Sequence, residues 1–264
     1  MAGNPWKSIF SSLADKDLLL PYLKAAIRSS QWPESYTIEV DSSPYYGTGD
    51  GYFHPSTHAV STTFNNAEAR YLYYRFHPEH RDHLIFDERD VQAEMTMAMG
   101  SALHAVVQTQ FQMAGILRPE NVEVDYLIEE HHVRGRIDMI VDHPIEGPLI
   151  VELKTINSRS FDSQTKPKPE WEAQLSLALH AYGHPYGVLL ALESGWPYRF
   201  REFRVPRNDE LLSSIFARFD HVRESIALDR PPEPCCALGS VQMTKCPARM
   251  LCWLSPDPQQ RPGH

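Results

Sequence analysis

The run Gly135-Arg136-Ile137-Asp138-Met139-Ile140-Val141 is followed, after seven residues, by Leu149-Ile150-Val151-Glu152-Leu153-Lys154-Thr155. Both runs are rich in β-branched residues, and the segment between them, Asp142 to Pro148, is typical of a turn. The stretch therefore predicts a β-hairpin. Side chains alternate between the two faces of a strand. We expect one face of the second strand to be apolar and the other to carry Glu152 and Lys154.

The predicted pairing brings two acids together. Asp138 is expected on the face opposite to Ile137 and Met139. If the hairpin is symmetric about Ile145, Asp138 pairs with Glu152, with Cβ atoms roughly 5 Å apart. Two carboxylates directly opposed destabilise a strand pair unless a cation lies between them. The sequence thus predicts an acidic pair with an amine beside it.

This pattern suits a divalent metal and phosphodiester hydrolysis. Mg²⁺ takes oxygen ligands, usually one or two carboxylates with waters and substrate phosphates. Such a metal lowers the pKa of a bound water and neutralises charge developing on phosphate. Lys154 is placed to hold or deprotonate that water. The alternative is a solvated strand face, where Glu and Lys are common. The apolar remainder of the strand and an aspartate at hairpin spacing favour the metal site.

Further motifs resemble the PD-(D/E)XK nuclease superfamily, in particular its RecB-like branch of phage and CRISPR-associated exonucleases. A helical stretch with Gly100 and His104 matches G-x-x-x-H, Asp138 matches the motif aspartate, and Glu152-Leu153-Lys154 matches E-x-K. Gln174 matches the glutamine of the following helix. The chain departs from the pattern before Asp138, where Pro is absent. It also departs four residues after Gln174, where Ala178 stands and the nearest tyrosine is Tyr182.

The resemblance covers roughly residues 50 to 255, and it implies roles for individual residues. His104, Asp138, Glu152 and the Leu153 carbonyl would bind the metal, and Lys154, Glu152, Asp138 and Gln174 would form the catalytic set. Imidazole suits softer ions than Mg²⁺, which makes Mn²⁺ an alternative. Taken alone, His104 and Gln174 would be ordinary polar positions on helices.

The order of elements predicts an α/β fold, with a mixed central sheet flanked by helices in a restriction-endonuclease-like core. We divide the chain into an N-terminal extension (1–50), a nuclease core (51–230) and a Cys-rich tail (231–264) that closes on the core. Helices are predicted at 16–28, 66–77, 88–115, 170–182 and 208–229. Besides the two strands of the hairpin, strands are predicted at 121–129, 187–193 and 198–205. A polar loop is predicted at 158–169.

Two helices in this set have apolar faces. In the helix at 66–77 the face is aromatic, with Tyr71, Tyr73, Tyr74 and Phe76, and such residues are usually core rather than base-stacking platforms. In the helix at 88–115 the apolar positions fall near the 3.6-residue period, which predicts a helix with one apolar face. These positions are 91, 95, 98, 99, 102, 103, 106 and 107.

Composition sets further bounds. The chain has 264 residues, 42% of them hydrophobic, and a net charge of −9. No apolar run reaches the ~18 residues of a membrane helix, and the start lacks the apolar core of a secretory signal. We expect a cytoplasmic protein, in the host cytoplasm if the chain is phage-encoded. Acidic charge does not exclude DNA binding, because local basic strips suffice. One candidate strip includes Lys166 and Lys168, and Tyr182 is a candidate DNA contact.

All four cysteines, Cys235, Cys236, Cys246 and Cys252, fall in the last 30 residues of the chain. In a cytosolic protein, clustered cysteines indicate a metal or redox site more often than disulfides. The resemblance implies a [4Fe–4S] cluster with one cysteine ahead of the core and three after it. The leading one is absent here, so Cys235 or a non-cysteine ligand would complete the set. Zn²⁺ and simple packing as small apolar residues are the alternatives.

These observations predict a metal-dependent DNA exonuclease acting at duplex ends or on single strands in phage recombination or repair. Exonucleases of this kind work with single-strand annealing proteins, which makes such a protein a candidate partner. A catalytically silent DNA-binding or assembly subunit is one alternative, although the intact E-x-K argues against it. An RNA-directed nuclease is another, although no RNA-binding module is recognisable. The chain lacks a phosphate-cradling G-x-x-x-x-G-K-[ST] loop, which excludes an ATP-driven helicase.

Overall fold

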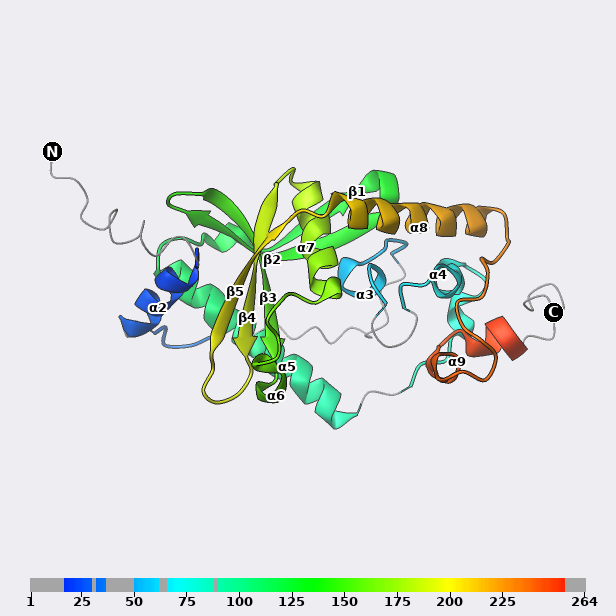
Figure 1. Cartoon of the computed structure of the whole chain (residues 1–264), viewed down its shortest axis with the longest axis horizontal. Coiled ribbons are helices and arrows are strands. Elements are labelled where there is room, and N and C mark those ends of the chain that lie inside the picture. Colours follow the sequence, from blue (N-terminus) through cyan, green and yellow to red (C-terminus); the bar gives the residue numbers. More distant parts are fainter. Residues whose placement is uncertain (1–16, 30–31, 37–49, 62–65, 88–89, 255–264) are drawn as a thin grey trace.

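The computed structural model describes residues 17–29, 32–36, 50–61, 66–87 and 90–254. Within these ranges the strands form one five-stranded sheet in the order β1-β2-β3-β4-β5 (Figure 1). Neighbouring strands are antiparallel, except that β3 and β4 are parallel. This mixed sheet confirms the predicted fold class. The strands are β1 (Val122–Ile128), β2 (Val133–His143), β3 (Gly147–Ile156), β4 (Tyr186–Glu193) and β5 (Phe200–Pro206).

Helices cover both faces of the sheet. Helices α2 (Leu20–Arg28) and α5 (Val91–Met113) pack on one face, and α7 (Pro169–Ala181) crosses the other. Helix α8 (Asp209–Ala227) contacts both α7 and α4 (Ala69–Phe76). The short helices are α3 (Pro55–His58), α6 (Ser158–Phe161) and α9 (Val241–Lys245), with 3₁₀ turns at Arg81–His83, Pro119–Asn121 and Glu129–His131 and a π turn at Met250–Leu254.

Side-chain alternation in the central strands creates two cores. In β4, Val188, Leu190 and Leu192 join the core under α2 and α5, whereas Leu189 and Ala191 join the core under α7. A strand buried on both faces is what its continuous apolar sequence predicts. The sheet is therefore a rigid, dry platform for any side chain at its edge.

The hairpin between β2 and β3 has the predicted register. Met139 pairs with Val151 and Val141 with Leu149, so the hairpin is symmetric about Ile145. The turn is shorter than the predicted one, because the strands continue to His143 and Gly147. The His143 Nδ1 atom accepts the backbone N–H groups of Ile145 and Glu146, and it thereby closes a tight turn that the sequence did not reveal.

The predicted order of elements is confirmed for the core, with small shifts at element ends. The segment 158–169, predicted as a loop, contains α6. The Asn157 side chain accepts the N–H of Ser160 and caps this helix, which explains the difference. The aromatic face of α4 is core as predicted, since Tyr71, Tyr73 and Tyr74 are buried.

The helix predicted at 88–115 is confirmed as α5, but the apolar positions in its first half are not buried. Val91, Met95 and Met99 are exposed, and burial begins only at Val107. The N-terminal half of the helix projects beyond the edge of the sheet in Figure 1. Apolar periodicity predicts which side chains share a face, but burial also requires a neighbouring element to pack against that face.

Helix α2 belongs to the predicted N-terminal extension, of which residues 1–16, 30–31 and 37–49 lie outside the described residues. Its first turn is held by an acid from β5. The Glu202 carboxylate accepts the N–H groups of Leu18, Leu19 and Leu20 at 2.6, 2.9 and 3.1 Å. A carboxylate suits the positive end of a helix and satisfies its unpaired donors. This contact fixes α2 on the sheet.

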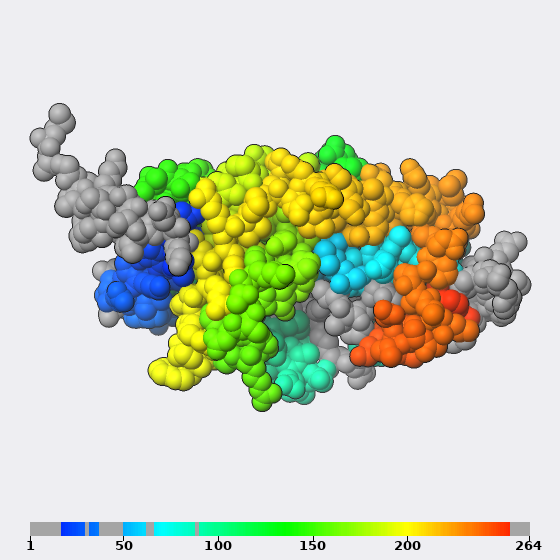
Figure 2. Space-filling view, in the orientation of Figure 1, coloured from blue at the N-terminus to red at the C-terminus, as the bar shows by residue number. Residues whose placement is uncertain are grey.

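The C-terminal tail returns to α4 at the end of the molecule away from α2, where Figure 2 shows it as an orange to red patch beside residues coloured cyan. Arg70 in α4 donates to the Pro232 carbonyl and to the Cys252 sulfur. Within the described residues, no helix has the length and apolar character needed to span a bilayer.

One prediction concerns Gly187 at the start of β4. A Cβ there would lie 2.7 Å from the Ile150 carbonyl oxygen, a backbone atom that cannot move aside. We expect Gly187→Ala to lower the free energy of unfolding by about 1–3 kcal/mol through overpacking, measured by urea denaturation.

The matched control is Gly100→Ala in α5, where a Cβ would meet Thr155 Oγ1 at an ordinary 3.7 Å. This variant should be neutral or stabilised by up to about 1 kcal/mol, because glycine weakens helix interiors. Equal stability of the two variants would show that the close approach at Gly187 is relaxed in solution.

Candidate active site

The hairpin fixes Asp138 close to the backbone of β3. The ladder between β2 and β3 is paired up to Met139 and Val151, and one step further the Leu153 N–H donates to Asp138 Oδ2 at 2.6 Å. A side-chain carboxylate thus accepts a strand N–H at this end of the ladder. The hydrogen bond orients Asp138 and stabilises its charged form.

Asp138 also marks a change of face in β2. Ile137 packs in the core under α7, whereas Met139 packs in the core under α5. The prediction that these two residues share a face is therefore wrong. The pairing with β1 passes over Asp138 and Glu123, and Glu123 has a φ of 53°. Such a distortion breaks regular alternation and re-aims side chains.

Glu152 and Lys154 lie on the same face of β3, as predicted. Lys154 Nζ donates to Glu152 Oε1 at 2.7 Å and to Gln174 Oε1 at 2.7 Å. Gln174 comes from α7, so the amine joins the sheet to the helix above it. Only 4% of the Glu152 side chain and 21% of the Lys154 side chain are exposed, which makes this a largely desolvated ion pair.

His104 reaches the same place from α5. Its Nδ1 atom lies 3.8 Å from Asp138 Oδ1. One turn further along the helix, the Gln108 amide nitrogen donates to Glu123 Oε1 at 2.8 Å and to the Asp138 carbonyl at 3.1 Å. Residues four apart share a helix face, so His104 and Gln108 project toward the hairpin together.

Roles for Glu123, Gln108 and Arg136 were not predicted from the sequence. Glu123 is held between Gln108 and Arg136, whose Nε lies 2.8 Å from Glu123 Oε2. The available signals were an acid on the strand before the hairpin and a glutamine one turn after His104. Using the first requires the β1–β2 register and the distortion at Glu123, neither of which the sequence reveals.

Burial dominates the electrostatics of the acids. It raises the pKa of Asp138 to about 6 and that of Glu152 to about 7, and the Asp138 charge adds to the rise at Glu152. Burial alone would lower the pKa of the Lys154 amine. The carboxylates of Glu152 and Asp138 outweigh it, so that this pKa lies above its ordinary value. Lys154 therefore stays protonated, a state suited to holding a water or phosphate rather than to deprotonating it.

The donor set fits a divalent cation. Ligand atoms of His104, Glu123 and Asp138 all lie within 4.8 Å of one another. Burial lowers the pKa of His104, which leaves the imidazole in the neutral form that binds metals. A divalent ion between these groups would favour the charged carboxylates against the burial and mutual repulsion that raise their pKa values. A metal role for the Leu153 carbonyl stays a prediction.

The predicted DNA contacts lie around α7. Lys166 and Lys168 are exposed just ahead of the helix, and the Lys168 amine lies 5.0 Å from the Trp171 ring centre. Tyr182 is the C-cap of α7, roughly 12 Å along the axis from Gln174. Arg199, a further cation of the candidate basic strip, forms ion pairs within the chain. Arg199 pairs with Glu193 and Asp162.

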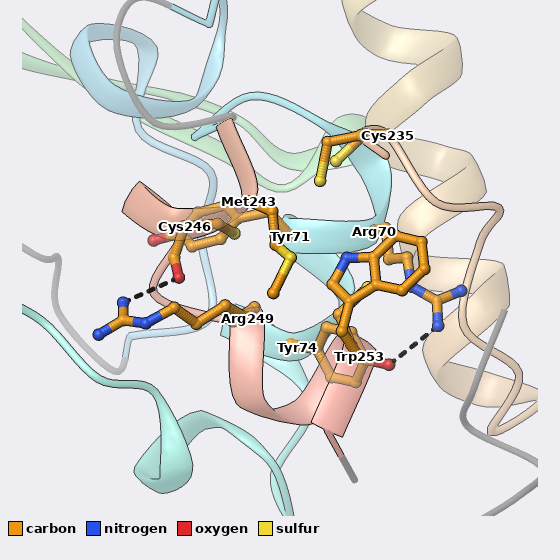
Figure 3. Close-up of a pocket in the computed structure, with 11 residues that line it drawn as sticks. Arg70, Tyr71, Tyr74, Cys235, Met243, Cys246, Arg249 and Trp253 are labelled. Atoms are coloured by element: carbon orange, nitrogen blue, oxygen red, sulfur yellow. Dashed lines mark hydrogen bonds between the residues drawn. The ribbon is translucent and has the colours of Figure 1, made fainter. Parts of the chain in front are cut away.

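All four cysteines line one pocket, which we call the thiol pocket (Figure 3). They are free thiols, and burial raises the pKa of Cys235 to about 12 and that of Cys246 to about 11. No three of the sulfur atoms lie within 4.8 Å of one another among the described residues. A single Zn²⁺ with Zn–S bonds of about 2.3 Å draws its sulfurs closer than that, so a closed zinc site is not preformed.

Neither family models nor curated proteins match this sequence. Solved structures do match. The crystal structure of LHK-Exo in complex with dAMP has a TM-score of 0.50 at 15% identity, covering 69% of this chain and 90% of that chain. The alkaline exonuclease LHK-Exo from Laribacter hongkongensis has a TM-score of 0.49 at 16% identity, covering 68% and 89%. SSO0001 has a TM-score of 0.44 at 15% identity, covering 89% and 93%.

At these identities the likeness concerns the fold. It confirms the restriction-endonuclease-like architecture expected from the resemblance to PD-(D/E)XK nucleases. The fold alone does not assign a reaction to the site, because one fold can support many functions, and the chemistry depends on the residues of the site itself.

A prediction about pH follows from the raised carboxyl pKa values. In the metal-free folded protein, the pKa of Asp138 is about 6 and that of Glu152 about 7, whereas both are near 4 in the unfolded chain. The pH window of interest runs between these values. Since the folded state holds its protons more tightly, its stability falls as pH rises through this window. Mn²⁺ binds the deprotonated acids, so the rise in Tm that it causes should be larger at pH 8 than at pH 6.

The control is Asp138→Asn, which keeps an oxygen for the Leu153 N–H. At pH 8 and without metal, this variant should be about 1–3 kcal/mol more stable than the parent, because a buried charge is removed. Its Tm should respond weakly to Mn²⁺. A metal response independent of pH, or unchanged in the variant, would contradict a site centred on Asp138.

Proposed function

We propose that this protein is a divalent-metal-dependent DNA exonuclease that hydrolyses phosphodiester bonds at DNA ends. The observation that carries the proposal is the half-buried Asp138 beside the buried Glu152, with the protonated Lys154 amine 2.7 Å from Glu152. Two side chains far away in sequence reach this group, His104 from α5 and Gln174 from α7. Charged and polar groups gathered in this way lower the stability of the fold, and they are expected where a reaction requires them.

Each side chain has a proposed role. His104, Glu123, Asp138 and Glu152, with the Leu153 carbonyl, would hold Mg²⁺ or Mn²⁺, and the imidazole favours Mn²⁺. When bound, the ion supplies an activated water and neutralises charge on the phosphate. Lys154 orients the attacking water or a phosphoryl oxygen through its amine hydrogens. Gln174 accepts one of those hydrogens and so fixes the amine's direction.

The surroundings of the site suit a polyanion. Asp138 and Gln174 open into a groove of about 330 Å³ that is also lined by Arg134 and Arg136. The Arg134 guanidinium lies 5.8 Å from the ring centre of Tyr52, which lines the adjoining hollow. Cations attract phosphates, and an aromatic ring can stack on a base. Glu123 and Asp125 line the same groove, and the two arginines pair with Asp50 and Glu123, so a bound cation would be needed to balance these acids against a phosphate.

DNA is the favoured substrate because the structure with the same fold and a TM-score of 0.50 is described as an exonuclease in complex with dAMP. Lys166, Lys168 and Tyr182 are proposed as further contacts to DNA along α7. A role in phage recombination or repair, with a single-strand annealing protein as partner, is part of this proposal and stems from the sequence motifs.

The test is Lys154→Ala, assayed on linear duplex, circular duplex, single-stranded DNA and RNA, with and without Mg²⁺ or Mn²⁺. We expect metal-dependent release of nucleotides from linear DNA by the parent. The variant should keep metal binding but lose roughly 10²-fold or more of the rate, since it lacks a preorganised donor. Lys24→Ala, an exposed lysine in α2, is the control and should retain full activity.

The pattern of substrates separates the alternatives. DNA binding without cleavage by the parent would indicate a silent DNA-binding or assembly subunit. Cleavage of RNA alone would indicate an RNA-directed nuclease, and cutting of circles an endonuclease. If Lys154→Ala degrades linear DNA as fast as the parent, the assignment of Lys154 is wrong.

A second proposal concerns the thiol pocket. We propose that Cys235, Cys236, Cys246 and Cys252 ligate an iron–sulfur cluster. The four side chains converge on one pocket, and among the described residues no three of their sulfurs come within the 4.8 Å that a single zinc ion would require. With Cys235 as a ligand, no cysteine ahead of the core is needed.

Purification without oxygen tests this proposal. We expect a broad brown absorbance in the visible range, together with iron and acid-labile sulfide, and loss of all three in Cys246→Ser. The exposed Gln242→Ala change in the same tail serves as the control. Colourless protein containing zinc would replace the cluster by zinc. Colourless protein without metal would leave the four thiols as packing residues.

A further inference from the structure

A second group of metal-ligand side chains lies outside the candidate active site and outside the thiol pocket. His77, His80 and Asp229 each offer a ligand atom, and these atoms lie within 4.8 Å of one another. His77 Nε2 is 3.1 Å from Asp229 Oδ1, and the two imidazole rings have centroids 4.4 Å apart. The nuclease proposal uses none of these residues.

Two separate helices bring the group together. His77 is the C-cap of α4, and its N–H donates to the Tyr73 carbonyl. His80 follows one turn later, and its N–H donates to the His77 carbonyl. Asp229 lies two residues beyond the end of α8. Because α4 and α8 pack together, their C-terminal ends meet at this point.

Asp229 occupies a backbone conformation that disfavours most side chains. Its φ of 49° is left-handed, and its N–H donates to the Ile226 carbonyl at the end of α8. Glycine is the usual residue at such a helix end. Here a carboxylate stands there instead, and it accepts a hydrogen bond from the Tyr73 hydroxyl at 3.0 Å. The hydroxyl orients one carboxylate oxygen toward His77.

We propose that His77, His80 and Asp229 form a binding site for a divalent transition metal of the zinc class. Two imidazoles and one carboxylate are a ligand set that Zn²⁺ takes in proteins, with water in the remaining position. Imidazole ligands select against Mg²⁺ and Ca²⁺. The Asp229 side chain is 76% exposed and that of His77 8% exposed, so a metal would reach the site from solvent and rest against a buried imidazole.

The surrounding groups resemble the support that ligating residues require. The Tyr73 hydroxyl holds the carboxylate, and Tyr73 and Tyr74 flank the imidazole of His80, with ring centroids 5.9 and 5.5 Å away. Outer contacts of this kind fix the direction of ligands. His77 Nδ1 accepts the Glu79 N–H at 3.2 Å. Ligation through Nε2 would move the proton to Nδ1 and break this hydrogen bond, which is a cost that metal binding would have to outweigh.

A metal at this position would connect three parts of the chain. It would join the end of α4 to the end of α8, directly before the segment that leads to the thiol pocket. Arg70, in the same helix α4, already donates to the Pro232 carbonyl of that segment. The ion would therefore strengthen the attachment of the tail to the core, and it would do so whether or not the protein cleaves DNA.

The test uses the full chain and Zn²⁺ as the probe. Zinc bound per chain and its affinity are measured by equilibrium dialysis with elemental analysis, and Tm is measured with and without zinc. We expect His80→Ala to lose one equivalent of zinc, or to bind it roughly tenfold or more weakly. The increase in Tm caused by zinc should shrink in parallel. Nuclease activity with Mn²⁺ should stay that of the parent.

His83→Ala is the matched control, since His83 has the same spacing after His80 but lies exposed and outside the ligand group. It should bind zinc like the parent. Asp229→Asn is the second variant, because Asn tolerates the left-handed backbone and still accepts from Tyr73. It should fold and bind zinc more weakly.

Cobalt distinguishes this site from the thiols. Co²⁺ bound by nitrogen and oxygen gives visible bands without the intense near-ultraviolet absorption of a cobalt–thiolate bond. We expect the thiolate-free visible bands to disappear in His80→Ala and to remain in His83→Ala. Equal zinc stoichiometry, affinity and cobalt spectra in the parent, His80→Ala and Asp229→Asn would overturn the proposal.

Discussion

Two carboxyl groups and one amine share a largely dry space on the inner strands β2 and β3 of the sheet, and the surrounding residues stabilise that unequal charge. Lys154 can offset only one of the acids. The Leu153 N–H offsets part of the charge on Asp138, and Gln108 and Arg136 do the same for Glu123. Burying charges with incomplete partners costs stability. Such an arrangement persists where a bound cation repays the cost or where reactivity requires it.

Much of this arrangement could be predicted from the order of residues, because the hairpin is a local structure. The turn between β2 and β3 sets the register, and the register places position 138 one step beyond the Met139–Val151 pair. Gln174 and His104 could be added only through the motif resemblance, since nothing local relates two helices on opposite faces of a sheet. Their convergence depends on how α5 and α7 pack, which is a property of the whole core.

The residues that sequence reasoning missed share one physical reason. Glu123 acquires its place from a left-handed backbone at a non-glycine residue, which no propensity predicts. Its neighbour Gln108 looks like any polar position on a helix until both of its hydrogen-bond acceptors are known. The exposure of the first half of α5 has a related cause. Periodicity correctly grouped Met95 and Met99 on one face, but whether an element covers that face depends on the shape of the molecule.

Arg70 gives the tail a mechanical property. Its buried guanidinium donates to the Cys252 sulfur, to the Pro232 carbonyl and, within its own helix, to the Tyr74 hydroxyl. Withdrawal of the tail would remove two of these acceptors at once and leave a cation facing the apolar side of α4. Peeling the tail away residue by residue is therefore unfavourable. The tail and its helix should open as one cooperative unit, whose amides exchange their hydrogens with solvent together.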